Sequence, residues 1–222
     1  MNWKKLDFYP VMGEALTEGN TLKMDFSPAN SELTSVNLGN TQKFNDFVFD
    51  QLSNQNKKFG IGGYFEHRAI YQRSEVFVTQ ELDFRNIHLG VDIWAEAGTP
   101  VFAPFEGEVY SLQDNQGFGN YGGTIILQHE IGGESLYSLY GHLKRSDLTL
   151  WKVGDQVKFG DLLCHIGPFP ENGDWPPHLH FQLMLDMLGN YGDFPGVCSQ
   201  REMEKFRAIC PDPNLMIRCP MI

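Results

Sequence analysis

Residues 122–143 read GGTIILQHEIGGESLYSLYGHL, which is two runs rich in β-branched and aromatic residues on either side of Gly132-Gly133. Such runs are typical of strands, and a glycine pair between them is a turn signal, so this stretch predicts an antiparallel hairpin. Further runs with glycine turns occur at residues 98–112, 152–167 and 178–185. We therefore expect a mainly β fold, with an antiparallel β-sandwich or barrel-like core.

The two ends of the chain differ from this central pattern. Residues 1–75 contain polar and turn-prone stretches, so we interpret them as an N-terminal extension that packs on a core domain at residues 76–192. A short helix is expected within the extension, near residues 43–52. Residues 193–222 form a C-terminal tail with one helix candidate, SQREMEKFRAI, where Ser199 and Glu202 have the spacing of a capping box.

Composition excludes some classes of partner. The 222 residues include 17 Lys and Arg against 28 Asp and Glu, a net charge of -11, so we expect no affinity for nucleic acid. No apolar run has transmembrane length, and no signal peptide is evident, which predicts a cytoplasmic protein. The alternative is a periplasmic or extracellular protein whose signal segment has been removed. The sequence indicates no oligomeric state.

His88 and Asp92 form the first of two unusual histidine spacings. If HLGVD is a strand, positions i and i+4 point to one face, so an imidazole and a carboxylate share it, with Gly90 between them. Glycine at that position leaves room for an ion or a substrate to approach. The alternative is a surface His–Asp pair at the end of a strand.

His178 and His180 form the second spacing, in HLHFQLML. Alternation puts these histidines with Gln182 on one face, while Leu179 and Phe181 lie on the other and fix the strand in the core. Two neighbouring buried imidazoles without partners are costly, so a shared ligand explains the pattern. The alternative is a pair of solvent-exposed histidines.

Together, the two spacings supply two imidazoles and a carboxylate. This is the ligand chemistry of catalytic zinc, which keeps three protein ligands and one open position. The sequence lacks the H-E-x-x-H helix motif, whose glutamate would act as a base. A catalytic base must then come from the spare histidine of the His178/His180 pair or from His142, in the stretch YGHL.

Three motifs in order are H-x-x-x-D (His88, Asp92), Y-x-H-L (His142) and H-x-H (His178, His180). With the intervening strands, residues 85–186 resemble the lysostaphin-type or LytM-like zinc metallopeptidases, the M23 peptidase family. The resemblance implies that His88, Asp92 and His180 bind Zn2+, while His142 and His178 act as acid and base beside the substrate carbonyl. It also implies an endopeptidase acting on the stem or cross-bridge peptides of peptidoglycan.

Two other functions use the same residues. One is a non-catalytic regulatory or binding module on the same fold, which binds wall fragments or a partner protein without cleaving them. The other is an intracellular zinc amidase or peptidase with a substrate outside the wall.

Several further residues have structural interpretations. We expect His129 and His165 to be satisfied structural residues, and His67 not to be a ligand. The stretch GGYFEHRAIYQRS at residues 62–74 is interpreted as an ordinary edge strand rather than the wall of a groove. The glycine-rich loop at residues 117–123 does not open a helix and lacks the lysine of a nucleotide-binding loop, so it is placed at the rim of a substrate groove.

Overall fold

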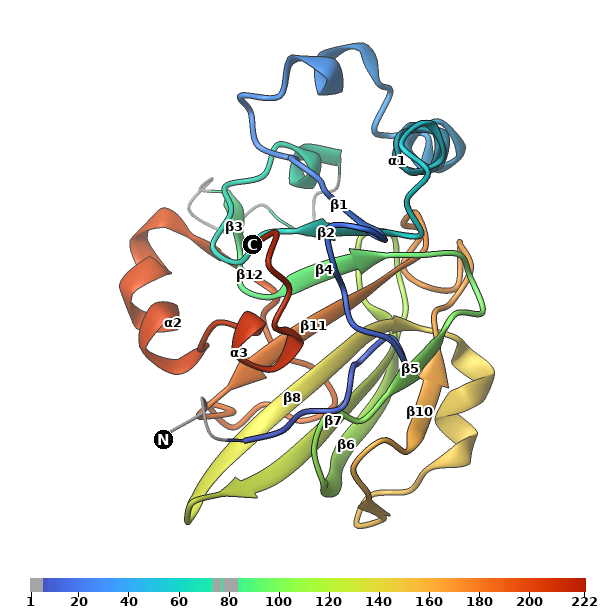
Figure 1. Ribbon diagram of the computed structural model, residues 1–222. Coiled ribbons are helices and arrows are strands. Elements are labelled where there is room, and N and C mark those ends of the chain that lie inside the picture. The colour runs from blue at the N-terminus through green and yellow to red at the C-terminus, as the bar shows by residue number, and fades with distance from the viewer. Residues whose placement is uncertain (1–5, 74–76, 78–83) are drawn as a thin grey trace.

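A large sheet forms the centre of the protein in the computed structural model, which describes residues 6–73, 77 and 84–222 (Figure 1). All its neighbouring strands are antiparallel except the parallel first pair, so the predicted mainly β, antiparallel fold is confirmed. In spatial order the strands are β1 (Thr21–Lys23), β2 (Phe59–Gly62), β4 (Val91–Trp94), β11 (His178–Met184), β8 (Glu134–Leu143), β7 (Gly122–Ile131), β6 (Gly107–Asn115) and β9 (Gln156–Val157).

The predicted hairpin at residues 122–143 is β7 and β8. Its register runs from Ile131 opposite Glu134, with Gly132 and Gly133 as the two turn residues. Their φ angles are 65° and 82°, in the left-handed region that glycine enters without steric cost. The glycine pair therefore sets the register of the two central strands.

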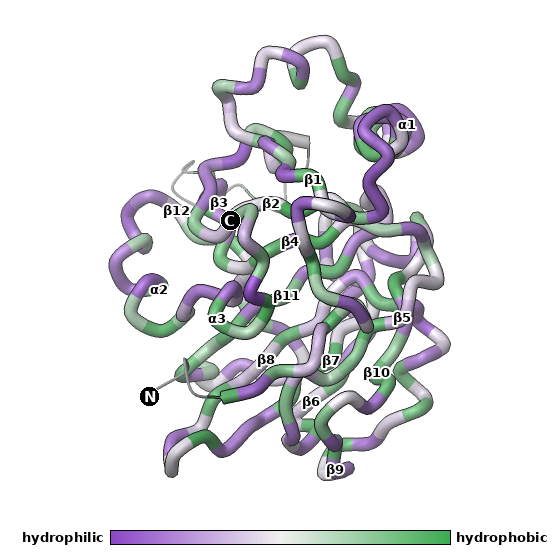
Figure 2. The backbone as a smooth tube through the Cα atoms, viewed as in Figure 1, coloured by the Kyte–Doolittle hydropathy of each residue, from purple (hydrophilic) through white to green (hydrophobic). Residues whose placement is uncertain are grey.

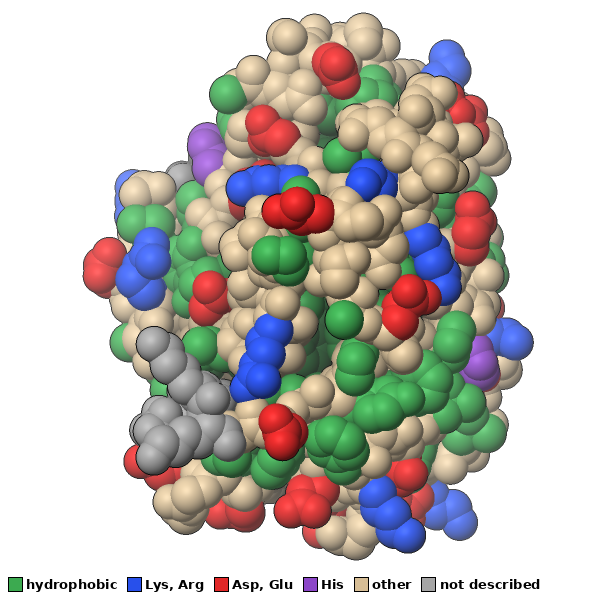
Figure 3. Space-filling view, viewed as in Figure 1, with side chains coloured by type: hydrophobic (Ala, Val, Ile, Leu, Met, Phe, Trp, Pro, Cys, Tyr) green, Lys and Arg blue, Asp and Glu red, His purple; other side chains and the backbone are tan. Residues whose placement is uncertain are grey.

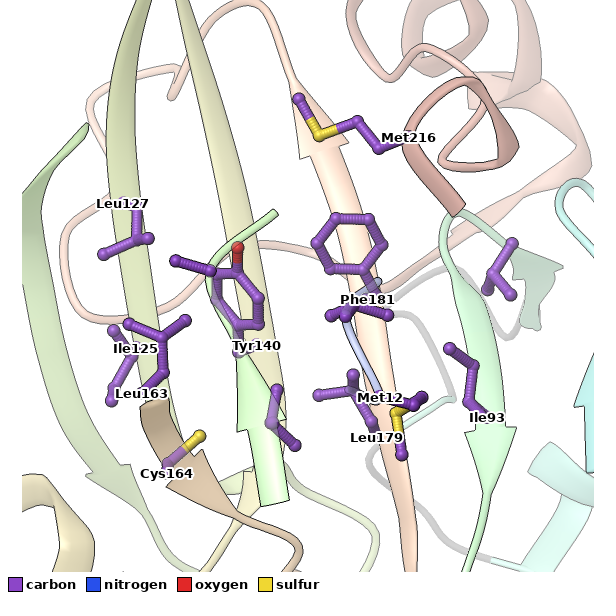
Figure 4. Close-up of a cluster of buried hydrophobic side chains, with 14 of the residues drawn as sticks. Met12, Ile93, Ile125, Leu127, Tyr140, Leu163, Cys164, Leu179, Phe181 and Met216 are labelled. Atoms are coloured by element: carbon purple, nitrogen blue, oxygen red, sulfur yellow. The ribbon is translucent and has the colours of Figure 1, made fainter. Parts of the chain in front are cut away.

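Two smaller two-stranded sheets complete the β structure. The first pairs β5 (Pro100–Phe102) with β10 (Leu162–His165), and its apolar residues share one core with the large sheet. The second pairs β3 (Arg85–His88) with β12 (Val197–Ser199). Figure 4 shows Ile93, Tyr140, Leu179 and Phe181 in the core, together with Met12 and Met216 from near the two ends of the chain.

The helices lie outside the sheet, and the two in the tail each pack an apolar side chain, Phe206 and Met216, on its core. The two predicted helices are confirmed, and the Ser199–Glu202 capping box is present. The helices are α1 (Thr41–Asn54), α2 (Met203–Ile209) and α3 (Asn214–Ile217), with 3-10 turns η2 (Ser31–Ser35), η3 (Ile70–Arg73), η5 (Arg145–Leu150) and η6 (Gln200–Glu202). Figure 2 shows α1 as largely hydrophilic on the outside of the molecule, whereas α2 is mixed.

The extension and the tail both pack on the central sheet. Phe26 and Phe44 of the extension share a buried cluster with Trp94 and Trp175. Phe194 and Phe206 of the tail lie in another cluster on Ile126 and Leu139. The extension also supplies β1 and β2 to the large sheet, which the sequence did not predict. The division into residues 1–75, 76–192 and 193–222 stays a prediction, because packing does not test independent folding.

On the face drawn in Figure 3, acidic and basic side chains are interspersed, without a large basic patch among the described residues. Within the described part of the chain, no helix is both long enough and apolar enough to cross a bilayer.

Candidate metal centre and active site

Strands β4 and β11 bring Asp92 and His180 directly opposite each other across their shared ladder. Along β11, Leu179 and Phe181 enter the core, which leaves His178 and His180 on the other face as the alternation predicts. Both histidines are buried, with 4% and 3% of their surface exposed, so the alternative of two solvent-exposed histidines is wrong. The extension and the tail instead cover the side chains of His178 and His180.

The predicted single strand for HLGVD is wrong. β3 ends at His88, β4 begins at Val91, and the two strands belong to different sheets. His88 and Asp92 still converge, because the chain turns at Leu89 and Gly90. A Cβ atom at Gly90 would lie 2.8 Å from the His180 ring, so this glycine makes room for a histidine rather than for an ion or a substrate.

Three side-chain atoms meet at one point. The His180 Nδ1 atom lies 3.0 Å from both His88 Nε2 and Asp92 Oδ1, and the latter two are 3.3 Å apart. A tetrahedral zinc ion with bonds of about 2.0 Å holds its ligand atoms about 3.3 Å from one another. The three residues therefore have the spacing of a zinc site, and they form the group of possible ligands that the described residues bring together.

Hydrogen bonds on the far side of each ring fix the tautomer of the two histidines. His88 Nδ1 donates to the Gly63 carbonyl at 3.1 Å, and His180 Nε2 donates to Gln182 Oε1 at 2.9 Å. The Gln182 amide cannot be reversed without loss, because its Nε2 atom donates to the Pro195 carbonyl. Each imidazole thus carries its proton away from the site. Two lone pairs then face each other at 3.0 Å, an arrangement that a shared cation stabilises.

His142 and His178 lie beside these ligand atoms with ring centroids 4.1 Å apart. Each Nδ1 atom donates to a backbone carbonyl at 2.7 Å, that of Asn172 for His142 and that of Pro176 for His178. Each Nε2 atom is therefore free of a proton in the neutral ring. His178 Nε2 lies 3.9 Å from Asp92 Oδ1, so an unprotonated nitrogen borders the proposed ligand set.

Arg68 is the site residue that sequence reasoning missed. Its buried Nη1 atom forms an ion pair with Asp92 Oδ2, and its Nε atom lies 2.7 Å from Glu66 Oε2. Tyr71, from the same segment, has its hydroxyl 3.3 Å from Arg68 Nη1. The interpretation of residues 62–74 as an ordinary edge strand rather than a groove wall is wrong for the second half of this stretch, because η3 begins at Ile70 and Tyr71 lines the pocket, whereas residues 65–68 do run beside β3. The only signal in the sequence was a group of charged residues within an aromatic stretch.

A pocket with a volume of about 190 Å³ opens in front of the histidines. Tyr71, Phe77 and Trp175 line it on the side of the extension, and Tyr121 and Phe194 line it on the side of the tail. The predicted rim position of the 117–123 loop fits, since residues 119–121 contribute to this lining.

The remaining histidines lie away from the pocket. His129 is buried and bonds the Glu106 carbonyl and Ser138, and His165 bonds Asp147, which confirms their structural interpretation. His67 is exposed and bonds Asn86, and it is not among the possible metal ligands.

The sequence of this chain was compared with those of known protein families. Residues 86–190 match the sequence model of Peptidase family M23. This segment is similar to M23 peptidases over its whole length. It contains the five histidine and aspartate positions described above, whereas Arg68, Pro195 and most of the aromatic pocket wall lie outside it.

The curated relatives that this chain matches are longer than the chain, which spans less than half of their length. The peptidoglycan DD-endopeptidase ShyC of Vibrio cholerae is 27% identical over 180 residues, which cover 79% of this chain and 37% of that protein. The glycyl-glycine endopeptidase ALE-1 of Staphylococcus capitis is 35% identical over 105 residues, or 46% and 26% of the two chains. The solved catalytic domain of lysostaphin from Staphylococcus simulans is 28% identical, with a TM-score of 0.37, over 55% of this chain and 80% of that one.

Burial shifts the pKa of several residues of this site. It lowers the pKa of His88 to about 3, and the nearby Arg68 guanidinium acts in the same direction. Burial likewise lowers the pKa of His142 and of His178. For Asp92, burial alone would raise the pKa, but the positive charges of protonated His88 and of Arg68 outweigh it and hold the pKa well below its ordinary value. At neutral pH His88, His142 and His178 are therefore neutral, and Asp92 is a carboxylate.

These shifts predict that the chelator-treated, metal-free protein is sensitive to acid. A group with a lowered pKa binds fewer protons in the folded than in the unfolded state, so stability is lost as the pH falls. For His88 the window runs from its ordinary value of 6.5 down to about 3. We expect the Tm to decrease across this window, and to decrease less in a His88→Gln variant. If the Tm of the two proteins fell in parallel with pH, the acid sensitivity could not be assigned to His88.

Proposed function

We propose that this protein is a zinc-dependent endopeptidase that hydrolyses a peptide bond in the stem or cross-bridge peptides of peptidoglycan. The observation that carries the proposal is the convergence of His88 Nε2, Asp92 Oδ1 and His180 Nδ1 at 3.0 to 3.3 Å, with the histidine lone pairs turned inward. A buried set of this kind, beside two further neutral histidines and a pocket, has the chemistry of a hydrolytic metal site.

His88, Asp92 and His180 would hold the metal, which when bound polarises a carbonyl and lowers the pKa of water. His142 and His178 both present an Nε2 atom without a proton to the same pocket. Either atom can accept the proton of the attacking water, and the protonated ring can then give it to the leaving amine. The carbonyls of Asn172 and Pro176 keep the two rings in this orientation during the transfer.

The substrate class follows from the relatives. ShyC is named as a peptidoglycan DD-endopeptidase and ALE-1 as a glycyl-glycine endopeptidase, so two kinds of bond in wall peptides are candidates. We expect the purified protein with zinc to cleave DD-cross-linked muropeptides or a pentaglycine peptide, with new termini identified by mass spectrometry. Chelation should stop the cleavage and zinc should restore it.

Binding of these peptides without cleavage, by a folded and zinc-loaded protein, would instead favour a non-catalytic module. A wall substrate also requires the working protein to lie outside the cytoplasmic membrane, which is the alternative to the cytoplasmic location expected from the sequence. Fractionation of cells that produce the native protein tests this point. A protein confined to the cytoplasm would favour an intracellular zinc amidase or peptidase.

A further inference from the structure

The segment that precedes residues 86–190 inserts a buried guanidinium behind the proposed metal site. We propose that Arg68, with its charge balanced by Glu66, is a positioning residue that holds the Asp92 carboxylate in the orientation required for metal binding. This inference rests on the proposed function, since it assigns a role in assembling the same site. It extends the functional unit to residues outside the segment that matches the family.

Backbone hydrogen bonds fix where Arg68 lies. Phe65 donates to the His88 carbonyl at 2.8 Å, His88 donates to the Glu66 carbonyl at 2.9 Å, and Arg68 donates to the Asn86 carbonyl at 2.9 Å. Residues 65–68 therefore run alongside β3, the strand that ends at the ligand His88. The same segment presents the Gly63 carbonyl to His88 Nδ1, so one stretch of chain supports two of the three proposed ligands.

The geometry divides the two oxygens of Asp92 between two tasks. Arg68 Nη1 pairs with Oδ2, while Oδ1 lies 3.3 Å from His88 Nε2 and 3.0 Å from His180 Nδ1. With Oδ2 bound to a cation on one side, rotation of the carboxylate would break a buried ion pair, which is costly. Asp92 therefore presents a single oxygen to the two histidine nitrogens.

The guanidinium is itself held firmly. Its carbon lies 5.9 Å from the centroid of the Phe26 ring and 5.7 Å from that of Trp94. A Cβ atom at Gly62 would come within 2.8 Å of Arg68 Nη2, so the neighbouring strand approaches the guanidinium closely. A planar fork in a close-fitting aromatic cavity can orient a carboxylate, which the round ammonium group of lysine cannot do equally well.

Charge explains why Glu66 belongs to the same unit. An uncompensated guanidinium beside Asp92 would repel an incoming dication. The Glu66 carboxylate, 2.7 Å from Arg68 Nε, cancels that charge and leaves the charge of Asp92 available for the metal. The structure thus combines orientation by Arg68 with neutralisation by Glu66.

Metal affinity separates this role from simple electrostatics. We would measure the zinc dissociation constant by competition with a chromophoric chelator, and the absorption spectrum of the Co2+ form as a readout of ligand geometry. For Arg68→Lys, which keeps the charge and loses the fork, we expect about 10- to 100-fold weaker zinc binding and an altered Co2+ spectrum. The matched control is Arg145→Lys, because the exposed Arg145 forms an ion pair with the partly buried Asp114, away from the proposed metal site.

A second variant covers the case in which Arg68→Lys does not fold. Glu66→Gln keeps the shape of the side chain and removes the compensating charge, so we expect weaker zinc binding at an unchanged Co2+ spectrum. A merely structural role predicts lower Tm values for both variants with the zinc affinity of the wild type. Wild-type zinc affinity in the folded Arg68→Lys and Glu66→Gln proteins would therefore overturn the inference.

Zinc binding and peptide cleavage, measured in the wild type and in both variants, distinguish failure of this inference from failure of the proposed function. Zinc binding and peptide cleavage that survive in both variants would overturn the role of Arg68 and leave the endopeptidase intact. Zinc binding that both variants weaken, in a protein that cleaves no peptide, would support the role of Arg68 and overturn the endopeptidase. A wild-type protein that binds no zinc would overturn both.

Discussion

Replacing His180 with alanine should remove the bound zinc and reduce peptide hydrolysis to background. In the proposed site His180 supplies one of three ligand atoms, and the two that would remain, from His88 and Asp92, make an incomplete site. Because the metal contributes several kcal/mol to such reactions, the expected loss in turnover is on the order of 10³-fold or more. Zinc content by mass spectrometry and cleavage of the best wall peptide would both be measured.

The matched control for this experiment is His67→Ala. His67 is an exposed histidine of the extension whose side chain bonds Asn86, away from the pocket. We expect this variant to keep one zinc per chain and normal turnover. A folded His180→Ala protein that retains one zinc per chain would contradict the ligand assignment.

The convergence of the proposed ligands could be predicted from sequence in part, because their spacing is local. Alternation along a strand separates His178 and His180 from Leu179 whatever the rest of the fold is. The spacing of His88 and Asp92 pointed to two side chains that do converge, but for a partly wrong reason. Their convergence depends on a turn at Gly90 and on the His180 ring that packs against it, which no local pattern reveals.

The supporting residues could not be predicted, because long-range register decides their contacts. Arg68 and Asp92 are 24 positions apart, and they meet because residues 65–68 run beside β3. Gln182 was expected on the face of the histidines, but its role depends on Pro195, thirteen positions away in the tail. The sequence contains no motif for either contact.

The same distinction holds for the fold. The β7–β8 hairpin was predictable because a glycine pair marks its turn, and the tail helix because Ser199 and Glu202 mark its start. Strand β1 has three residues and pairs in parallel with β2. The connection between the two strands contains α1. Such a short strand carries no readable alternation, so the contribution of the extension to the sheet becomes visible only in the structure.

Loss of His142 should reduce turnover while the metal stays bound. His142 is not among the three ligand residues, but its Nε2 atom lacks a proton and its ring lies 4.1 Å from that of His178. Removing a general acid or base costs about 10²- to 10⁴-fold in kcat. The φ angle of His142 is 63°, a region that asparagine tolerates better than alanine, so His142→Asn is the cleaner variant. Single-turnover rates and zinc content would be compared with the wild type.

The His178→Ala variant and the double variant show whether the two histidines act together. If both rings serve one proton transfer, the double variant should be about as slow as the slower single variant, because residues that act as a unit are not additive. Independent roles predict that the two losses multiply. A zinc-loaded His142→Asn protein with wild-type turnover would exclude His142 from the chemistry. The carbonyl of Asn172 would then hold a structural histidine at the rim of the pocket, and His178 alone would remain to move the proton.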